Sequence, residues 1–377
     1  MPNPLRELAP ILEVLAENID VLPAAGKAVE DYLHPDPEEL EDVLINNEVG
    51  EVTAFAEVPE PKLTNLYRPT PPIFRHQKPF YRYFIDGSIR TYFLATGIEG
   101  TRSFPIELAQ VGAAVVERNY DGNVKVLASN HKVLLLIPKG AQGVSDAVWQ
   151  QLEKIKTADG LIEIHNVDKK HALNKSEEGE GDLRNKAGAK ARHRMHELEI
   201  ELIKATEGLR NESNWLILDG AVKLDDFVNS PYLIGVAKSF RKDPQFYFGR
   251  KHGRNQERHD VTAILAGLPH AHRTVAFSAY GGKVAFWYVR LREQRELDYP
   301  LMGVVKVELP RPHKTPVDAE LADLISGALV AERNVAPYGR DRRWHCHLYP
   351  IFIAEQVIKS RFFSQDVLLG AIRWPRR

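Results

Sequence analysis

The sequence predicts an α/β protein in which helices flank a mixed β-sheet, preceded by an N-terminal helical and extended region. Three observations predict this class: strand-like apolar runs begin near residue 80, one long helical pattern interrupts them, and buried strands resume after it. The 377 residues, 44% of them hydrophobic, suffice for one large domain or two of ordinary size. We expect an N-terminal region over residues 1–75 and the sheet domain over residues 76–377.

The composition limits the class of protein further. A single cysteine, Cys346, excludes an internal disulfide framework and a four-cysteine zinc site. The first apolar stretch contains acidic residues and has no basic lead, unlike a secretory signal. No run approaches the roughly 18 to 20 apolar residues of a membrane span. We therefore expect a soluble, cytoplasmic protein with no membrane contact.

Charge is unevenly distributed along the chain. Residues 1–63 hold three basic and fifteen acidic residues, a net charge of −12, so the remaining 314 residues sum to +11. A basic body attracts polyanions, whereas an acidic appendage repels them. The alternative is that both regions are ordinary solvated faces.

Two elements are expected before the sheet. Residues 4–19 have apolar side chains at helical spacing, which predicts an amphipathic helix. We expect its apolar face to pack on the protein's own core, with a docking face for another protein as the alternative. Residues 58–78 are rich in proline and predict an extended arm.

The sheet is expected to begin at residue 79. Two β-rich runs flank Asp86-Gly87-Ser88, a pattern typical of a strand–turn–strand unit. Residues 165–190 are polar, charged and glycine-containing, which favours a surface loop or insertion. Between these segments we expect strands over 108–119, 124–129 and 131–138 and a short helix over 145–156.

The clearest helical pattern covers residues 191–209 and leads into a buried strand that ends at Asp219. After it we expect a strand ending at Lys238, a hairpin around Gly281-Gly282, a strand over 302–311 and a helix over 351–360. Antiparallel strands, a helix and a returning parallel strand are the order with which an RNase H-like sheet begins. We therefore expect an RNase H-like mixed sheet.

Three carboxylates stand out in this pattern. Asp86 and Asp219 are each followed by glycine, and we expect both to end hydrophobic strands, where a rigid base projects the carboxylate. Asp-Gly is also a common turn dipeptide. Glu199 lies on the inward face of the helix, beside Met195 and Leu202. A glutamate there is costly unless it is paired or holds a metal.

The alternative role for Glu199 is a buried ion pair with Arg192 or Arg194. In the functional interpretation, Asp86, Glu199 and Asp219 are the ligands of a metal centre. Mg²⁺ and Mn²⁺ prefer carboxylate oxygens, and nucleases use them to orient water and neutralise phosphate charge. Lys238 would contact the phosphate or position the water, and a surface lysine at a strand end is the alternative.

Basic segments predict the DNA track. Residues 238–258 interleave lysine and arginine with aromatic residues, a combination that grips phosphate and stacks on unpaired bases. A second basic patch covers residues 186–194. A solvated charged face is the alternative for either patch. The candidate DNA contacts are Arg241, Lys242, Arg250, Lys251 and Arg254.

Taken in order, the motifs resemble those of the NurA family of nucleases. The likeness runs from about residue 80 to residue 360 and includes FIDGS around Asp86, the helix with Glu199 and WLILDGAV around Asp219. It continues through YLIGVAKS with Lys238, VAFWYVRL, VVKVELPR with Glu308, and HLYPIFIAEQ with Tyr349. The resemblance implies an RNase H-like fold, a homodimer, Mn²⁺-dependent cleavage of DNA with Tyr349 assisting, and a hexameric HerA-type ATPase as partner. Some relatives act in phage defence.

One feature departs from the family pattern. The family follows its Tyr-Pro motif with an Ala-His pair whose histidine assists the site, whereas this chain has Ala354-Glu355-Gln356. Either Glu355 or Gln356 replaces the histidine, or His347 approaches from the other side. We therefore expect a metal-dependent DNA nuclease acting in end processing or phage defence. Two alternatives remain: a non-catalytic DNA-binding subunit that regulates an ATPase, and a junction resolvase on the same fold.

Overall fold

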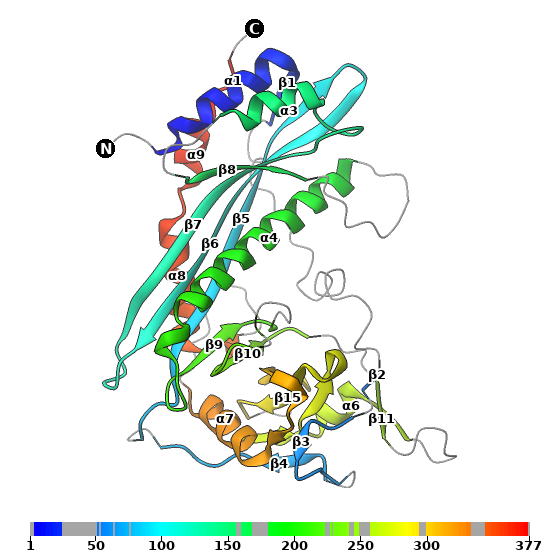
Figure 1. Ribbon diagram of the computed structural model, residues 1–377, viewed down its shortest axis with the longest axis vertical. Coiled ribbons are helices and arrows are strands. Elements are labelled where there is room, and N and C mark those ends of the chain that lie inside the picture. The colour runs from blue at the N-terminus through cyan, green and yellow to red at the C-terminus, as the bar shows by residue number, and fades with distance from the viewer. Residues whose placement is uncertain are drawn as a thin grey trace.

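The computed structural model describes residues 4–24, 51–52, 54–62, 65–74, 77–155, 160–167, 180–222, 227, 229–240, 245–248, 257–293, 299–332 and 344–375. The fold is mixed α/β (Figure 1). Its helices are α1 (Leu8–Asn18), α3 (Asp146–Glu153), α4 (Glu180–Ala205), α6 (Val261–Ala266), α7 (Ala319–Ala331), α8 (Tyr349–Arg361) and α9 (Gln365–Ala371). Within the described residues, no helix has the length and apolar character needed to cross a membrane.

A mixed sheet is the centre of the fold. Among the described residues it has twelve strands, in the order β4-β13-β15-β16-β10-β9-β5-β6-β7-β8, with β1 beside β5 and β14 beside β15. These strands are β1 (Asp20–Pro23), β4 (Tyr67–Pro69), β5 (Tyr81–Glu99), β6 (Arg102–Arg118), β7 (Val124–Ile137), β8 (Ile162–Asn166), β9 (Trp215–Asp219), β10 (Leu233–Ala237), β13 (His272–Thr274), β14 (Phe277–Ala279), β15 (Val284–Arg290) and β16 (Val304–Pro310). Strands β5, β9 and β10 run parallel, and β5, β6 and β7 are antiparallel neighbours.

Two smaller sheets contain the other strands of the described residues. One joins β2 (Glu51–Val52), β11 (Gln245–Phe248) and β12 (Glu257–Asp260). The other pairs β3 (Glu57–Val58) with β17 (Val317–Asp318). Strand β3 begins one residue before the proline-rich arm, and the arm itself contributes β4 to an edge of the large sheet.

Helices cover both faces of the long strands. Helix α4 packs on alternate residues of β6 and β7, among them Ala113 and Leu134. Helix α8 packs on the opposite face, where Ile358 and Phe362 contact Ala114 of β6. Figure 1 shows α4 crossing one side of the long strands and α8 running along the other. Burial on both faces explains why β6 is apolar almost without alternation.

Helix α4 differs from its expected limits. Residues 180–190, expected in a surface loop, form about its first three turns. Leu183, Ala187 and Ala191 continue the buried stripe to Met195 at steps of four residues, so the helix packs on the sheet although its other faces are charged. The helix ends at Ala205 rather than at the expected residue 209, and Leu209 is 46% exposed.

The N-terminal helix packs on the protein's own core, as expected. Helix α1 shares a buried cluster with α3, α9 and the far end of β5 and β6. The apolar side chains predicted to face inward are at most 2% exposed: Leu5, Leu8, Ile11, Leu12, Leu15 and Ile19. Leu22 of β1, which pairs with β5, is 58% exposed.

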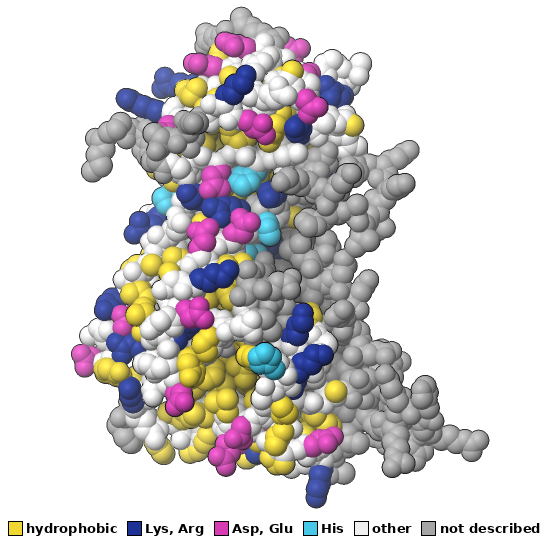
Figure 2. All heavy atoms as spheres, viewed as in Figure 1, with side chains coloured by type: hydrophobic (Ala, Val, Ile, Leu, Met, Phe, Trp, Pro, Cys, Tyr) yellow, Lys and Arg dark blue, Asp and Glu magenta, His cyan; other side chains and the backbone are white. Residues whose placement is uncertain are grey.

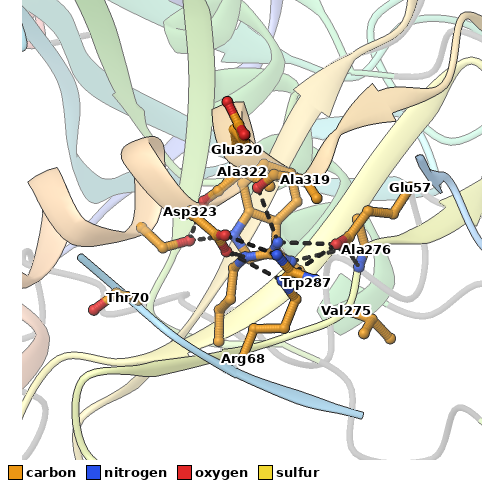
Figure 3. Close-up of polar contacts among 12 residues, drawn as sticks. Glu57, Arg68, Thr70, Val275, Ala276, Trp287, Ala319, Glu320, Ala322 and Asp323 are labelled. Carbon is orange, nitrogen blue, oxygen red and sulfur yellow. Dashed lines mark hydrogen bonds and ion pairs between the residues drawn. The ribbon is translucent and has the colours of Figure 1, made fainter. Parts of the chain in front are cut away.

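A buried ionic network ties the arm to the sheet and to α7 (Figure 3). The guanidinium of Arg273 is fully buried and donates to both carboxylate oxygens of Glu57, at 2.8 and 3.0 Å. Its Nε donates to Asp323 of α7 at 2.6 Å. Arg68 of β4 donates to the other oxygen of Asp323 at 3.0 Å. Because each buried charge has an opposite partner, the network secures β3 and β4 against the main sheet.

Candidate functional site

Register brings Asp86 and Asp219 together. In the parallel pairing of β5 and β9, Ile85 lies opposite Leu218, so the two aspartates are next to each other one residue later. Phe84 and Ile217, two residues before each aspartate, both join the cluster covered by α7 and α8. Since side chains alternate along a strand, both carboxylates project toward the face that these helices cover.

Asp86 does not end its strand. β5 continues to Glu99, and its pairing with β6 is unbroken from Tyr83 to Phe93, so the strand–turn–strand prediction at this position is wrong. Both flanking runs have the residue types of one continuous strand, and tertiary pairing overrides the turn preference of Asp-Gly. Asp219, in contrast, is the last residue of β9. Gly220 follows it with φ of 120°, a conformation that favours glycine.

Lys238 belongs to the same cluster. It directly follows β10, in which Val236 is the register partner of Asp219. The Lys238 Nζ donates to Asp219 Oδ2 at 2.5 Å, and the two side chains are only 13% and 12% exposed. The ammonium group therefore supplies a positive charge at the end of β9, in a partly dehydrated setting where electrostatic interactions are strengthened.

A further carboxylate comes from α8. Ala354 and Ile358 bury this helix against the sheet, and Glu355, between them, is partly buried. Glu355 is near enough to Asp86 to influence its ionisation, and it accepts a hydrogen bond from Lys359 at 2.6 Å. Gln356 is exposed. Glu355 is therefore one of the groups that act electrostatically on Asp86.

Tyr349 and His347 lie at the start of α8. Tyr349 is the first residue of the helix and is partly buried, about 9 Å along the helix axis from Glu355. His347 precedes the helix and is 5% exposed.

Glu199 approaches from the other face of the sheet. A Cβ built on Gly87 would lie 2.7 Å from Glu199 Oε1, and Gly87 faces α4 because it alternates with Asp86. Glu199 is 4% exposed, as its inward position on the helix predicts. Its carboxylate is 2.6 Å from His196 Nδ1, one turn earlier.

His196, which the sequence pattern did not single out, is therefore a partner of Glu199. The signal was the spacing of three residues, which brings side chains together on one helix face. Arg194, considered as a partner, instead binds Glu163, Glu197 and Glu201. Glu199 therefore lies on the opposite face of β5 from the two aspartates. It approaches the strand at Gly87, which has no side chain.

The electrostatics of the cluster centre on Asp86. Burial raises the pKa of Asp86 well above its ordinary value, and the negative charge of Asp219 raises it further. Lys238 opposes the increase, whereas Glu355 and Glu199 add to it. Burial and the neighbouring carboxylates therefore oppose the ionised form of Asp86, and a bound cation would favour that form.

The donor chemistry fits a divalent metal ion, since carboxylate oxygens are the ligands that Mg²⁺ and Mn²⁺ prefer. The side-chain arrangement is less complete. Among the described residues, no three histidine, cysteine, aspartate or glutamate side chains are gathered closely enough to hold a metal ion. Lys238 lies on Asp219, and Glu199 lies across β5 from Asp86. On the face of α8, Asp86 and Asp219 are the neighbouring carboxylates that could share a cation, and among the described residues Glu355 acts on Asp86 electrostatically without completing a three-ligand set.

The expected DNA contacts Arg241, Lys242, Arg250, Lys251 and Arg254 lie outside the described residues. On the face that carries α4, cations and carboxylates are interleaved around β8 and α4 (Figure 2). This cluster includes Glu163, bound by Arg194, and the pair His193–Glu197. Among the described residues of that face, the pair of Glu163 and Arg194 joins β8 to α4.

No protein-family model matches the chain, and no curated protein is significantly similar to it.

Proposed function

We propose that this protein is a divalent-metal-dependent deoxyribonuclease with an RNase H-like core. The observation that carries the proposal is the adjacency of Asp86 and Asp219 on parallel strands, with Lys238 and Glu355 beside them. The strand order β7-β6-β5-β9-β10, with α4 between β8 and β9 in the chain, supports the fold assignment. It follows the expected order of three antiparallel strands, a helix and a returning parallel strand.

A Mn²⁺ or Mg²⁺ ion at the acidic centre would neutralise phosphate charge and activate water for attack on phosphorus. The chain's own groups have distinct roles. Asp86 and Asp219, adjacent on parallel strands, are the carboxylates that would hold the ion and orient the water. Lys238 can exchange its contact with Asp219 for one with a phosphate oxygen. Tyr349, at the start of α8, is assigned the supporting role at the phosphate that the NurA resemblance implies.

Glu199 has a supporting place in this proposal. It lies across Gly87 from the aspartates and contributes negative charge to Asp86 from the α4 face. The proposal includes DNA end processing or phage defence in the cytoplasm, as a homodimer with a hexameric HerA-type ATPase. The acidic N-terminal region is proposed to dock on that partner.

A second candidate is a non-catalytic DNA-binding subunit that regulates an ATPase. The observation that favours it is the absence, among the described residues, of a group of three side chains able to hold a metal. The lysine on Asp219 and the missing family histidine point the same way.

Cleavage of linear DNA in Mn²⁺ tests the proposal, with and without the cognate ATPase. We expect Asp86→Ala and Asp219→Asn to lower the cleavage rate at least about a hundredfold. The matched control is Asp366→Asn, which removes an exposed carboxylate from the first turn of α9. If wild-type protein binds DNA but cleaves none with any metal or partner, the nuclease proposal is wrong. The second candidate, a non-catalytic DNA-binding subunit, then takes its place.

A further inference from the structure

The loop that follows Asp219 folds back over the neighbouring strand. Gly220 donates its backbone N–H to Val236 of β10 at 3.0 Å. A Cβ built on Gly235 would lie 2.6 Å from the Gly220 carbonyl oxygen and 3.0 Å from the Val222 nitrogen. The absence of a side chain at Gly235 therefore allows the loop to cross β10 at close range.

Glu308 holds that crossing from the next strand. It is the register partner of Gly235 in the antiparallel pairing of β10 with β16. Its Oε2 accepts a hydrogen bond from the Val222 backbone N–H at 2.8 Å, and its Oε1 accepts one from Lys306 Nζ at 2.5 Å. Glu308 thus reaches across the bare backbone of Gly235 to bind the loop three residues after Asp219.

Burying a glutamate at position 308 has a desolvation cost. Glu308 is 1% exposed, and its charge is balanced by Lys306, whose side chain is 15% exposed. An apolar residue at the same point of a sheet would avoid the desolvation cost of the ion pair. It would, however, leave the Val222 N–H without its acceptor, and it would free the end of β9.

The end of β9 is where restraint is needed. Asp219 faces the negative charge of Asp86, so repulsion acts to drive the two carboxylates apart. Lys238 restrains the Asp219 side chain, and the backbone contacts of Gly220 and Val222 restrain the strand end that carries it. A displacement of about 1 Å is enough to impair a catalytic constellation.

We propose that Glu308 is a positioning residue of the acidic centre. By accepting the Val222 N–H it holds the end of β9 in place, so that the Asp219 carboxylate lies beside Asp86. The effect of Glu308 on catalysis rests on the proposed function. Its structural content does not depend on cleavage. The length of the side chain and its acceptor oxygen carry the role, and the negative charge serves to balance Lys306.

The test is a series at position 308 with three readouts: Mn²⁺ affinity, the kinetics of DNA cleavage, and crystal structures of the metal-free variants. Glu308→Gln keeps the length and the acceptor oxygen, so its Mn²⁺ affinity and kcat should stay within about threefold of wild type. Glu308→Asp is too short to reach Val222, and Glu308→Ala has no acceptor. Both should weaken Mn²⁺ binding and lower kcat by at least about tenfold, with KM for DNA little changed.

Glu107→Ala is the matched control for loss of a buried carboxylate. Glu107 is also 1% exposed, lies on β6 and is 3.3 Å from a guanidinium nitrogen of Arg184. This variant should lose stability while keeping Mn²⁺ affinity and kcat. The proposal is overturned if Glu308→Ala behaves in the same way, or if Glu308→Gln is as impaired as Glu308→Ala.

The crystal structures separate this inference from the proposed function. In metal-free Glu308→Ala we expect Asp219 to move away from Lys238 by about 1 Å or more, and in Glu308→Gln we expect no such shift. If wild type binds Mn²⁺ without cleaving DNA, the nuclease proposal fails and the affinity series still decides the role of Glu308. If wild type binds no Mn²⁺, the position of Asp219 in the two variants decides it.

Discussion

Lys238 Nζ lies 2.5 Å from Asp219 Oδ2, so the lysine after β10 neutralises the carboxylate at the end of β9. The pair is adjacent to Asp86, whose pKa Lys238 lowers against the larger effects of burial and Asp219. Lys238 therefore acts as a built-in cation within an acidic cluster. This arrangement makes the stability of the metal-free protein depend on the lysine.

Lys238→Met tests that dependence. Removing one partner of a largely buried ion pair leaves the other charge uncompensated, and we expect a loss of about 3 kcal/mol in the free energy of unfolding in EDTA. Added Mn²⁺ should recover more stability in the variant than in wild type, because binding to the native state stabilises it. Urea unfolding with EDTA or Mn²⁺ measures both effects. Equal stability of the two proteins in EDTA would show that the pair is not a stabilising element.

Asp86→Asn should separate stability from activity. Burial and the carboxylates of Asp219, Glu355 and Glu199 raise the pKa of Asp86, so its ionised form opposes folding above the ordinary pKa. The neutral amide should therefore raise the urea midpoint of the metal-free protein at pH 7, while DNA cleavage is lost. As pH falls through the raised pKa, the wild-type aspartate takes up a proton and the difference should shrink. A variant less stable than wild type at pH 7 would contradict this account.

Glu355 and Gln356 provide a test within one turn of α8. Glu355 is partly buried and acts electrostatically on Asp86, whereas Gln356 is exposed. We expect Glu355→Gln to weaken Mn²⁺ binding and cleavage by about tenfold or more, and Gln356→Ala to change neither beyond about twofold. Mn²⁺ affinity measured by electron paramagnetic resonance gives a readout without DNA. An equal effect of both substitutions would assign the loss to α8 itself.

The sequence predicted the burial of a single helical side chain better than the pairing of distant strands. Helical periodicity was enough to turn Glu199 inward, because that property depends only on the helix's own residues. Which strand pairs with β5, and in which register, depends on contacts between distant segments. The adjacency of Asp86 and Asp219 therefore remained an expectation until the pairing of β5 with β9 was known.

The sequence also did not predict toward which face of the sheet each side chain of β5 points. Asp86 and Gly87 project to opposite sides of β5, so Glu199 meets the glycine and Glu355 acts on the aspartate. A one-residue change in the assumed register would exchange the two faces. The turn expected at Asp86 failed for a related reason, because the pairing with β6 holds the strand straight through Asp-Gly.

Arg273→Met should strongly destabilise the fold. It would leave the buried Glu57 carboxylate without the two guanidinium contacts at 2.8 and 3.0 Å, which we expect to cost about 3 kcal/mol or more. Arg68→Met is the control, because the Arg68 side chain is 36% exposed and its ion pairs should contribute less than about 1 kcal/mol. Chemical unfolding compares the two variants. Similar small losses in both would mean that the network does not anchor β3.

The contacts of Glu163 with His165 and Arg194 should make the free energy of unfolding depend on pH in the acidic range. Burial raises the pKa of Glu163, but hydrogen bonds from His165 and Arg194, the latter at 2.9 Å, outweigh burial and lower the pKa to about 2 from 4.5. A carboxyl group whose pKa is lower in the folded state stabilises the fold above its unfolded pKa. This contribution should be complete above about pH 5 and disappear as pH falls from about 4.5 to 2.

Unfolding in urea across this pH range, for wild type and Glu163→Gln, measures the effect. The variant should be less stable at pH 7 and approach wild type near pH 2, since protonated Glu163 no longer accepts charge-assisted hydrogen bonds. Glu13→Gln, which removes an exposed carboxylate of α1, is the control and should follow wild type throughout. A constant difference between wild type and Glu163→Gln from pH 7 to pH 2 would show that β8 is held to α4 by packing rather than by this charge.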